Sequence, residues 1–158
     1  MPIVKFDFKG NGADGEIHGR DILEHWGPTA YVSIGKPIDV YHQFQQQGNT
    51  GVRMSREPFY ALMDTGATCS SIRIDVAQNL GLKVVDKQPL RGVTGVEQHP
   101  IYLGFIMIKN VPAMNVYGRL FGIHADNLAP HRVILGRDFM RGGLFIYDSF
   151  SGHFSFAK

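Results

Sequence analysis

Residues 61–67 read Ala61-Leu62-Met63-Asp64-Thr65-Gly66-Ala67. The three apolar residues predict the end of a buried β-strand, which delivers the carboxylate of Asp64 into a turn. An acidic side chain at the end of a core strand is a candidate for acid–base chemistry. The alternative is an ordinary turn in which Asp64 ends the strand and Gly66 supplies a positive φ angle.

Two later stretches bear on this choice. An apolar strand again ends at glycine in Ile134-Leu135-Gly136-Arg137-Asp138, where the glycine follows Asp64 by 72 residues. Between the two strands lies Gly92-Val93-Thr94-Gly95, a glycine-flanked turn joining two β-patterned runs. That pattern predicts a β-hairpin with a flexible tip.

The composition favours an all-β protein with one domain. The chain has 158 residues, 44% of them hydrophobic, which fits a single core. Its 19 glycines and 8 prolines cut the sequence into short apolar runs. The predicted strands span residues 3–8, 30–34, 59–63, 83–90, 102–109, 114–117, 133–135, 144–147 and 153–156. A single short helix is predicted at residues 74–80, with Val76 and Leu80 on one face and Gly81 as its stop.

Two further regions are irregular or ambiguous. Residues 36–57 are polar and contain three consecutive glutamines, so we expect a mobile surface loop rather than a low-complexity interaction tract. Residues 19–23 resemble residues 136–140, but the apolar strand before the second copy has no counterpart before the first. We therefore interpret this likeness as chance rather than duplication.

Charge, cysteine and histidine patterns exclude several classes of function. The 16 basic and 14 acidic residues are scattered, so we expect no nucleic-acid and no membrane partner. Cys69 is the only cysteine, which forbids an intrachain disulfide and favours a reducing compartment. The seven histidines have no metal-ligand spacing, so neither a metal nor a cofactor is expected. With no secretion signal or membrane-spanning run, we expect a soluble, cytoplasmic protein.

In this order the motifs resemble those of the retropepsin-like aspartic proteases, the single-lobed relatives of retroviral protease. That family has a strand leading into Asp-Thr-Gly-Ala, a short helix, a flap hairpin and an Ile-Leu-Gly-Arg-Asp strand with its helix. The resemblance implies a closed acid-protease barrel, an obligate two-fold homodimer and hydrolysis of peptide or protein substrates. It covers most of residues 28–156 and implies a protease domain of residues 28–158 with an insertion at about 36–57, which leaves residues 1–27 as an extension of unknown role.

The resemblance also implies roles for individual residues. Asp64 and its symmetry mate would form the catalytic dyad, supported by the active-site loop residues Thr65, Gly66 and Ala67. The implied flap tip consists of Gly92, Val93, Thr94 and Gly95. The implied cleft-lining or structural residues are Cys69, Ile134, Leu135, Gly136, Arg137 and Asp138.

The sequence also departs from the family pattern. Many viral members carry an aspartate after Asp-Thr-Gly-Ala that pairs with the arginine of the later motif, whereas Thr68 stands here. Arg137 would then use Asp138, Asp75 or backbone carbonyls. Cys69 could be a thiol nucleophile, but no histidine spacing indicates its activation, so we interpret it as a packing or cleft-lining residue.

Two functions other than proteolysis fit parts of the pattern. A catalytically silent module could keep the fold and bind peptides by β-augmentation. A small ligand-binding β-barrel would explain the strands and glycines but would leave the Asp64 and Gly136 motifs as coincidence.

Overall fold

The computed structural model describes residues 3–7, 10–12, 15–17, 19–37, 52–92, 95–108, 116–124 and 130–157, and most of them lie in β-strands. The structure is thus mostly β, which confirms the all-β prediction at the level of class, while the closed barrel and the homodimer stay predictions. The strands are β1 Ile3–Asp7, β2 Gly10–Gly12, β3 Gly15–Ile17, β4 Thr29–Pro37, β5 Val52–Met54, β6 Phe59–Met63, β7 Ser71–Arg73, β8 Val84–Gly92, β9 Gly95–Ile108, β10 Val116–Ile123, β11 Val133–Leu135, β12 Leu144–Asp148 and β13 His153–Ala157. The helices are α1 Gly19–Trp26, α2 Ile74–Asn79 and α3 Arg137–Met140.

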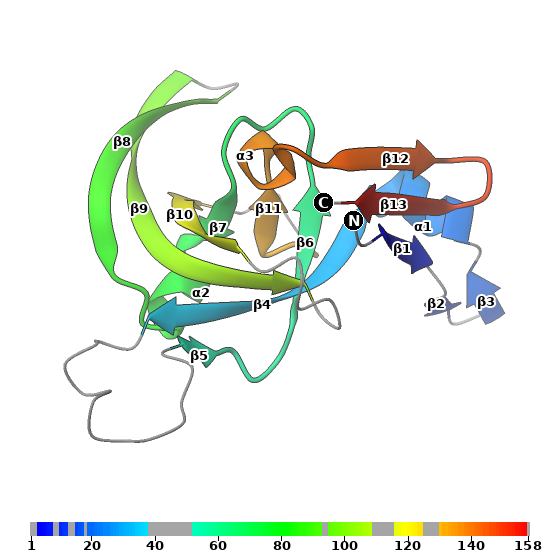
Figure 1. The fold of residues 1–158 in the computed structure, drawn as a ribbon, viewed down its shortest axis with the longest axis horizontal. Helices are drawn as coiled ribbons and strands as arrows, with labels where there is room; N and C mark the ends of the chain where they lie inside the picture. The colour runs from blue at the N-terminus through cyan, green and yellow to red at the C-terminus, as the bar shows by residue number, and fades with distance from the viewer. Residues whose placement is uncertain are drawn as a thin grey trace.

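An eight-stranded sheet forms the body of the molecule, in the order β5-β4-β6-β11-β7-β10-β9-β8. Strand β4 also pairs with β9, so the pairings run from β4 through β6, β11, β7, β10 and β9 back to β4. The long β8–β9 hairpin curves along one side of this sheet (Figure 1). Because β6 and β11 run parallel, their carboxyl ends meet at the same edge.

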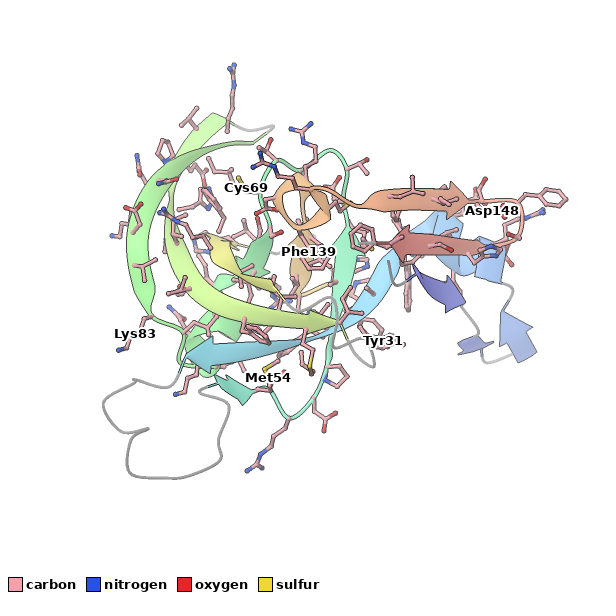
Figure 2. The ribbon with its side chains drawn as sticks, in the orientation of Figure 1. Tyr31, Met54, Cys69, Lys83, Phe139 and Asp148 are labelled. Atoms are coloured by element: carbon pink, nitrogen blue, oxygen red, sulfur yellow. The ribbon has the colours of Figure 1, made fainter. Side chains whose placement is uncertain are left out.

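The core lies inside this sheet and is filled by alternate residues of its strands. Along β6, which lies between β4 and β11, Ala61 and Met63 are buried and Tyr60 is exposed. Helix α3 adds Phe139, whose side chain points inward and is 2% exposed (Figure 2). Burial of each such large apolar side chain stabilises the folded state by about 1.5–3 kcal/mol relative to leaving the side chain exposed.

A separate three-stranded sheet has the order β1-β13-β12 (Figure 1). Strand β1 pairs antiparallel with the whole of β13, from Ile3 opposite Ala157 to Asp7 opposite His153. On β13, Phe154 and Phe156 are completely buried in the main core. The first residues of the chain are therefore paired with its last strand, while the proposed domain division at residue 27 stays a prediction.

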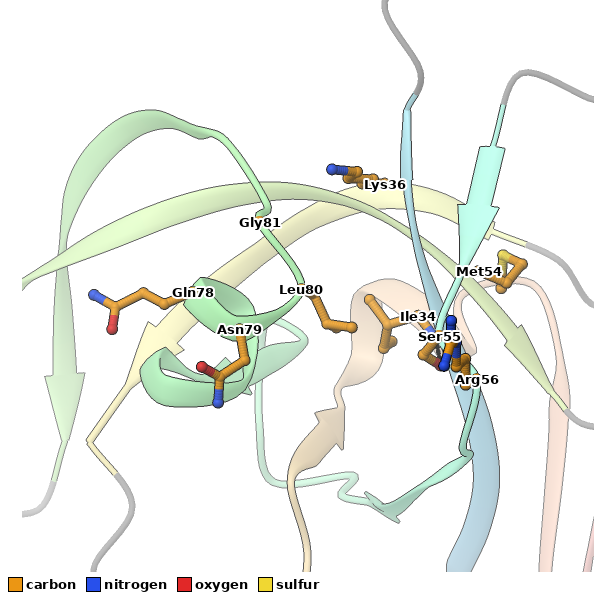
Figure 3. A pocket seen from close by; sticks show the side chains of 9 residues that line it. All are labelled: Ile34, Lys36, Met54, Ser55, Arg56, Gln78, Asn79, Leu80 and Gly81. Atoms are coloured by element: carbon orange, nitrogen blue, oxygen red, sulfur yellow. Dashed lines mark hydrogen bonds between the residues drawn. The ribbon is translucent and has the colours of Figure 1, made fainter.

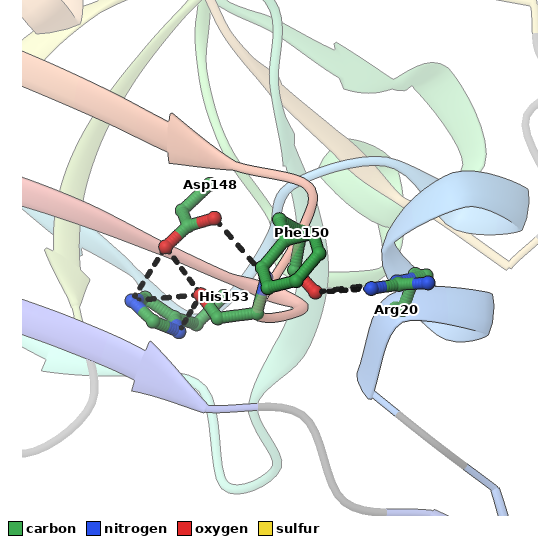
Figure 4. Close-up of polar contacts among 5 residues, drawn as sticks. Arg20, Asp148, Phe150 and His153 are labelled. Carbon is green, nitrogen blue, oxygen red and sulfur yellow. Dashed lines mark hydrogen bonds and ion pairs between the residues drawn. The ribbon is translucent and has the colours of Figure 1, made fainter.

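The prediction of a single helix is wrong, because α1 and α3 exist besides the confirmed helix α2. Among the α1 residues whose burial is described, only Leu23 is fully buried, so the apolar pattern is too sparse to be recognised as a helix. The helix is secured by a distant part of the chain, since the Arg20 guanidinium donates to the carbonyl of Phe150 at 2.8 and 3.2 Å and lies over its ring (Figure 4). Gly27, at φ +72°, and Pro28 end the helix.

The predicted strands all coincide with observed ones, but several boundaries differ and four strands were missed. Strand β9 begins at Gly95 rather than residue 102, because its first residues are exposed and pair only with β8. Strand β10 extends to Ile123 through two glycines that interrupt its apolar pattern. Short strands that depend on their neighbours were not predicted, namely β2, β3, β5 and β7.

The polar region at residues 36–57 contains ordered pairing at both ends. Strand β4 continues to Pro37, and β5 pairs with it antiparallel from Gly35 opposite Met54. Residues 38–51, the centre of the predicted loop, lie outside the described residues. In the part of the chain that the structure describes, no helix has the length and apolar character needed to cross a membrane.

Candidate active site

Asp64 stands at the end of β6, where the neighbouring parallel strand β11 also ends. Leu62 lies opposite Ile134 and Met63 opposite Leu135 in this parallel pair. The Asp64 N–H then donates to the Leu135 carbonyl at 3.0 Å, which continues the pairing by one residue. Two core strands thus fix the backbone from which the carboxylate projects.

The turn after β6 orients the carboxylate. The Gly66 N–H donates to Oδ1 of Asp64 at 2.8 Å, and the Ala67 N–H donates to the Asp64 carbonyl at 3.2 Å. A Cβ atom at Gly66 would lie 3.0 Å from the same Oδ1, so glycine permits this close approach. Asp64 is half-buried and Thr65 is exposed; Oδ2 accepts no hydrogen bond from any described residue.

The loop that follows is joined to the second motif by backbone contacts. The Arg137 N–H donates to the Ala67 carbonyl at 2.9 Å, and the Asp138 N–H donates to the Thr68 carbonyl at 3.3 Å. Gly136 packs directly on this loop, since a Cβ atom there would lie 2.6 Å from the carbonyl carbon of Cys69. The structure therefore brings the two predicted motifs together.

Ser70 connects the motifs through its side chain, although the sequence did not identify it as a site residue. Its hydroxyl donates to Oδ1 of Asp138 at 2.7 Å and accepts from the Gly136 N–H at 3.0 Å. Its own N–H donates to Oδ2 of Asp138 at 2.9 Å, and the Phe139 N–H donates to Oδ1 at 2.8 Å. Three of these hydrogen bonds join the loop to the second motif, and the fourth orients the Asp138 carboxylate within α3. No local pattern distinguishes Ser70 from an ordinary loop serine.

Arg137 contacts a residue that the sequence analysis did not consider as its partner. Its Nη2 donates to Oγ1 of Thr68 at 2.8 Å. Asp138 accepts from Ser70 instead, and Asp75 pairs with Arg73 at 2.5 and 2.9 Å. The prediction of Asp138, Asp75 or a backbone carbonyl is therefore wrong: a neutral hydroxyl stands where viral members use a carboxylate.

A cavity of about 420 Å³ opens beside this loop. It is lined by Cys69, Ser70, Gln88, Ile106, Gly118, Arg119, Leu120, Phe121, Asp138 and Phe139. Burial, followed by the charge of Asp138, raises the pKa of the Cys69 thiol, and the charge of Arg137 partly opposes this. A thiol with a raised pKa stays protonated near neutral pH, which supports a cleft-lining role over a nucleophilic one.

A charged network bridges β8 and β10 next to this cavity. Nη2 of Arg119 donates to Oδ2 of Asp86 at 2.5 Å, and the Gln88 amide donates to the same oxygen at 2.9 Å. The backbone N–H of Lys87, followed by Arg119, lowers the pKa of Asp86. Sequence reasoning missed this network, because its charged groups come from strands 33 residues apart.

The predicted hairpin after the helix is confirmed. Strands β8 and β9 pair antiparallel up to Gly92 opposite Gly95. Val93 and Thr94, the centre of the predicted flap tip, lie outside the described residues. Among the residues that the structure describes, no three His, Cys, Asp or Glu side chains are grouped as metal ligands.

The aspartyl protease family matches residues 50–139, more than half of the chain, and this range includes both motifs of the site. The chain therefore belongs to the aspartyl protease family, as the resemblance predicted. The structure is similar to the solution structure of the simian foamy virus (mac) protease, with a TM-score of 0.43 and 12% sequence identity. That likeness covers 71% of this chain and 90% of the viral one. No curated protein matches this sequence.

Proposed function

We propose that this chain is an aspartic endopeptidase in which Asp64 and Asp64 of a second copy activate one water molecule. The observation that supports this most directly is the orientation of Asp64, whose Oδ1 accepts from the Gly66 N–H within the matched family region. The hydrogen bond to Oδ1 holds the carboxylate while Oδ2 is left to meet water or the second carboxyl group. Asp64, Thr65, Gly66 and Ala67 would together form the catalytic loop.

The chemistry follows from two carboxyl groups that share one proton. Like charges about 3 Å apart do not both ionise, so one group stays protonated and the other acts as base. The ionised group removes a proton from water as it attacks the peptide carbonyl carbon, and the protonated group donates to the carbonyl oxygen. Transfer of a proton to the amide nitrogen then lets the carbon–nitrogen bond break.

A homodimer supplies the second carboxylate, because the chain contains a single Asp-Thr-Gly sequence. A two-fold axis would place the two loops face to face. The exposed position of Thr65 leaves its hydroxyl available to bind backbone of the opposite subunit. The site would be rigid because residues 136–138 form hydrogen bonds to the loop that follows Asp64, through backbone groups and through the side chains of Arg137 and Asp138.

The remaining parts of the fold take their roles from this arrangement. The ring of strand pairings would act as a closed barrel, and the β8–β9 hairpin as a flap whose tip is Gly92, Val93, Thr94 and Gly95. Residues 28–158 would be the catalytic unit, and residues 1–27 an extension that supports its last strand through β1.

The cavity beside Cys69 would receive a substrate side chain. Its apolar lining of Ile106, Leu120, Phe121 and Phe139 favours an aliphatic or aromatic group. Ile134 and Leu135 of β11, and Gly136 directly after it, would support this wall. The charge of Arg119 is compensated by Asp86, so the rim offers little attraction to an acidic side chain.

The test is hydrolysis of an unbiased peptide library by the wild-type protein and by Asp64→Asn. Asparagine keeps the size of the side chain and an oxygen for the Gly66 N–H, but removes the base and the shared proton, so we expect hydrolysis to be abolished. A statine-type inhibitor should block the wild type. Asp75→Asn, an exposed carboxylate paired with Arg73, is the matched control and should stay active.

Circular dichroism of each variant separates loss of chemistry from loss of fold. Full activity in Asp64→Asn would contradict the assignment. Peptide binding without any cleavage by the wild type would support the silent module instead. The dimer is tested separately by sedimentation and by activity on dilution: specific activity should fall below the dimer dissociation constant, and an active monomer would overturn the shared dyad.

A further inference from the structure

A second cavity lies away from the Asp64 loop, between the end of α2 and strands β4 and β5 (Figure 3). Its volume is about 330 Å³. It is lined by Ile34, Lys36, Met54, Ser55, Arg56, Gln78, Asn79, Leu80 and Gly81. None of these residues belongs to the loop that carries Asp64 or to α3, and Met54 lies across the molecule from Cys69 (Figure 2). The candidate active site does not account for this cavity.

Among the described residues, the lining contains two cations and no carboxylate. Lys36 is half-buried at the end of β4, and Arg56 is exposed in the turn after β5. Neither side chain has an ion-pair or hydrogen-bond partner among the residues that the structure describes. Arg73 and Arg119, by contrast, each hold an aspartate. Two uncompensated positive charges at one concave site attract an anion.

The end of α2 does not explain Lys36. A basic side chain often binds the free carbonyl groups at a helix C-terminus. Here the carbonyl oxygens of Val76, Ala77 and Gln78 already accept backbone N–H groups, at 3.0, 3.0 and 2.9 Å. Nζ of Lys36 lies 3.5 Å from where a Cβ atom of Gly81 would stand, so it is close to this turn, but it donates a hydrogen bond to none of the described carbonyl groups there. Its N–H donors are available to a ligand.

The rest of the lining provides a preformed wall. The Ser55 hydroxyl donates to the Glu57 carbonyl at 2.9 Å and accepts from the Ile34 N–H at 3.2 Å. The Ser55 N–H also donates to the Ile34 carbonyl at 2.8 Å, which fixes β5 against β4. Ile34, Met54 and Leu80 give the cavity an apolar surface, while the exposed amides of Gln78 and Asn79 add neutral donors.

We propose that this cavity binds a small ligand that carries one carboxylate or phosphate group and a short apolar part. The anionic group would lie between Lys36 and Arg56, and the apolar part would contact Ile34, Met54 and Leu80. The volume lies at the lower end of the range for small-molecule sites, about 300–1,000 Å³. The same chemistry can come from a free organic anion or from an acidic side chain of a peptide. The site is separate from the proposed protease function and needs no turnover.

Binding is tested by calorimetry and thermal unfolding of the full chain with four probes. Hexanoate carries both features, inorganic phosphate carries the charge alone, hexanol carries the apolar chain alone, and an end-capped peptide with one central glutamate represents the second source. We expect saturable binding of hexanoate, weaker binding of phosphate and none of hexanol. If the peptide binds and hexanoate does not, the same site would be assigned to a peptide carboxylate.

Substitutions then locate the site. Lys36→Gln and Arg56→Gln should each weaken binding about tenfold or more, because a charged hydrogen bond is lost. Lys36→Arg should retain it, and Lys87→Gln, an exposed cation on β8 outside the cavity, is the matched control. Asp64→Asn should bind as the wild type does, whether or not proteolysis occurs. Equal binding of hexanol, unchanged affinity in both glutamine variants, or no saturable binding of hexanoate, phosphate and peptide would overturn the proposal.

Discussion

The Ser70 hydroxyl donates a hydrogen bond to Oδ1 of Asp138 across 2.7 Å, so a residue of the loop after Asp64 binds the first turn of α3. The same hydroxyl accepts from the Gly136 N–H at 3.0 Å, and Ser70 is 3% exposed. One side chain thus satisfies a buried N–H group and a carboxylate that come from the second motif. The position of the Asp64 loop therefore depends on this contact as well as on the strands.

Replacing Ser70 by alanine should destabilise the fold. Ser70→Ala leaves the Gly136 N–H without its acceptor and removes one donor from Asp138, which costs about 1–3 kcal/mol. The free energy of unfolding in urea measures the loss. Ser33→Ala is the matched control, because Ser33 is half-buried on β4 and its hydroxyl binds no described residue; its effect should stay within about 0.5 kcal/mol. Equal effects of the two substitutions would contradict the role of Ser70.

Gly136 should not tolerate a side chain. A Cβ atom there would lie 2.6 and 2.8 Å from the carbonyl carbon and oxygen of Cys69, which belong to backbone and cannot rotate away. Gly136→Ala should therefore cost about 1–3 kcal/mol or more and displace the Asp64 loop. In Gly118→Ala the new atom meets nothing within 4 Å, so denaturant unfolding should show little change. A neutral Gly136→Ala would mean that the two motifs are not in this close contact.

Stability should depend on the protonation of His131. This side chain is 5% exposed and hydrogen-bonded to Oγ1 of Thr29 at 2.7 Å, and burial lowers its pKa. Between the lowered pKa and the usual value of about 6.5, the unfolded chain binds more protons than the folded one. The contribution of neutral His131 is therefore complete above about pH 6.5 and is lost as the pH falls toward the lowered pKa. Each unit by which the pKa of His131 in the folded state lies below its pKa in the unfolded chain contributes about 1.4 kcal/mol to the free energy of unfolding.

Two variants separate burial from hydrogen bonding at this position. His131→Gln cannot titrate, so the difference in unfolding free energy between pH 8 and pH 5 should decrease. Thr29→Val removes the hydrogen bond but keeps the ring buried, so it should lower stability while leaving the pH dependence in place. Urea unfolding at several pH values measures both. A pH dependence unchanged in His131→Gln would contradict the prediction.

Alkylation of Cys69 should block the cavity beside the Asp64 loop. Because burial and Asp138 raise the pKa of this thiol, its reaction with iodoacetamide should be slow at neutral pH and accelerate at alkaline pH. Mass spectrometry measures the rate, since the chain has one cysteine. The modified protein should show a raised KM for peptides with large apolar side chains. Cys69→Ser should keep activity and become insensitive to the reagent; inactivity of a folded Cys69→Ser would favour a thiol nucleophile.

The sequence by itself determined the local elements around the site. Strands β6 and β11 have the predicted bounds, and α2 differs by one residue at its end. The two strands are apolar runs that stop at a polar residue or glycine, and α2 is an amphipathic segment that stops just before Gly81. Burial and chain breaking are therefore both encoded locally. The order of motifs along the chain also determined the protein family.

Only the tertiary structure decided which side chains meet. Ser70 and Gly136 are 66 residues apart, and Arg20 and Phe150 are 130 apart, so no local pattern records either contact. Arg137 binds Thr68 because the folded strands place a hydroxyl within its reach and direct Asp138 toward Ser70. Helix α1 and the short strands likewise depend on neighbours distant in sequence. Such contacts form only when the chain closes long loops, and the geometry of the folded core then selects one partner among several of similar chemistry.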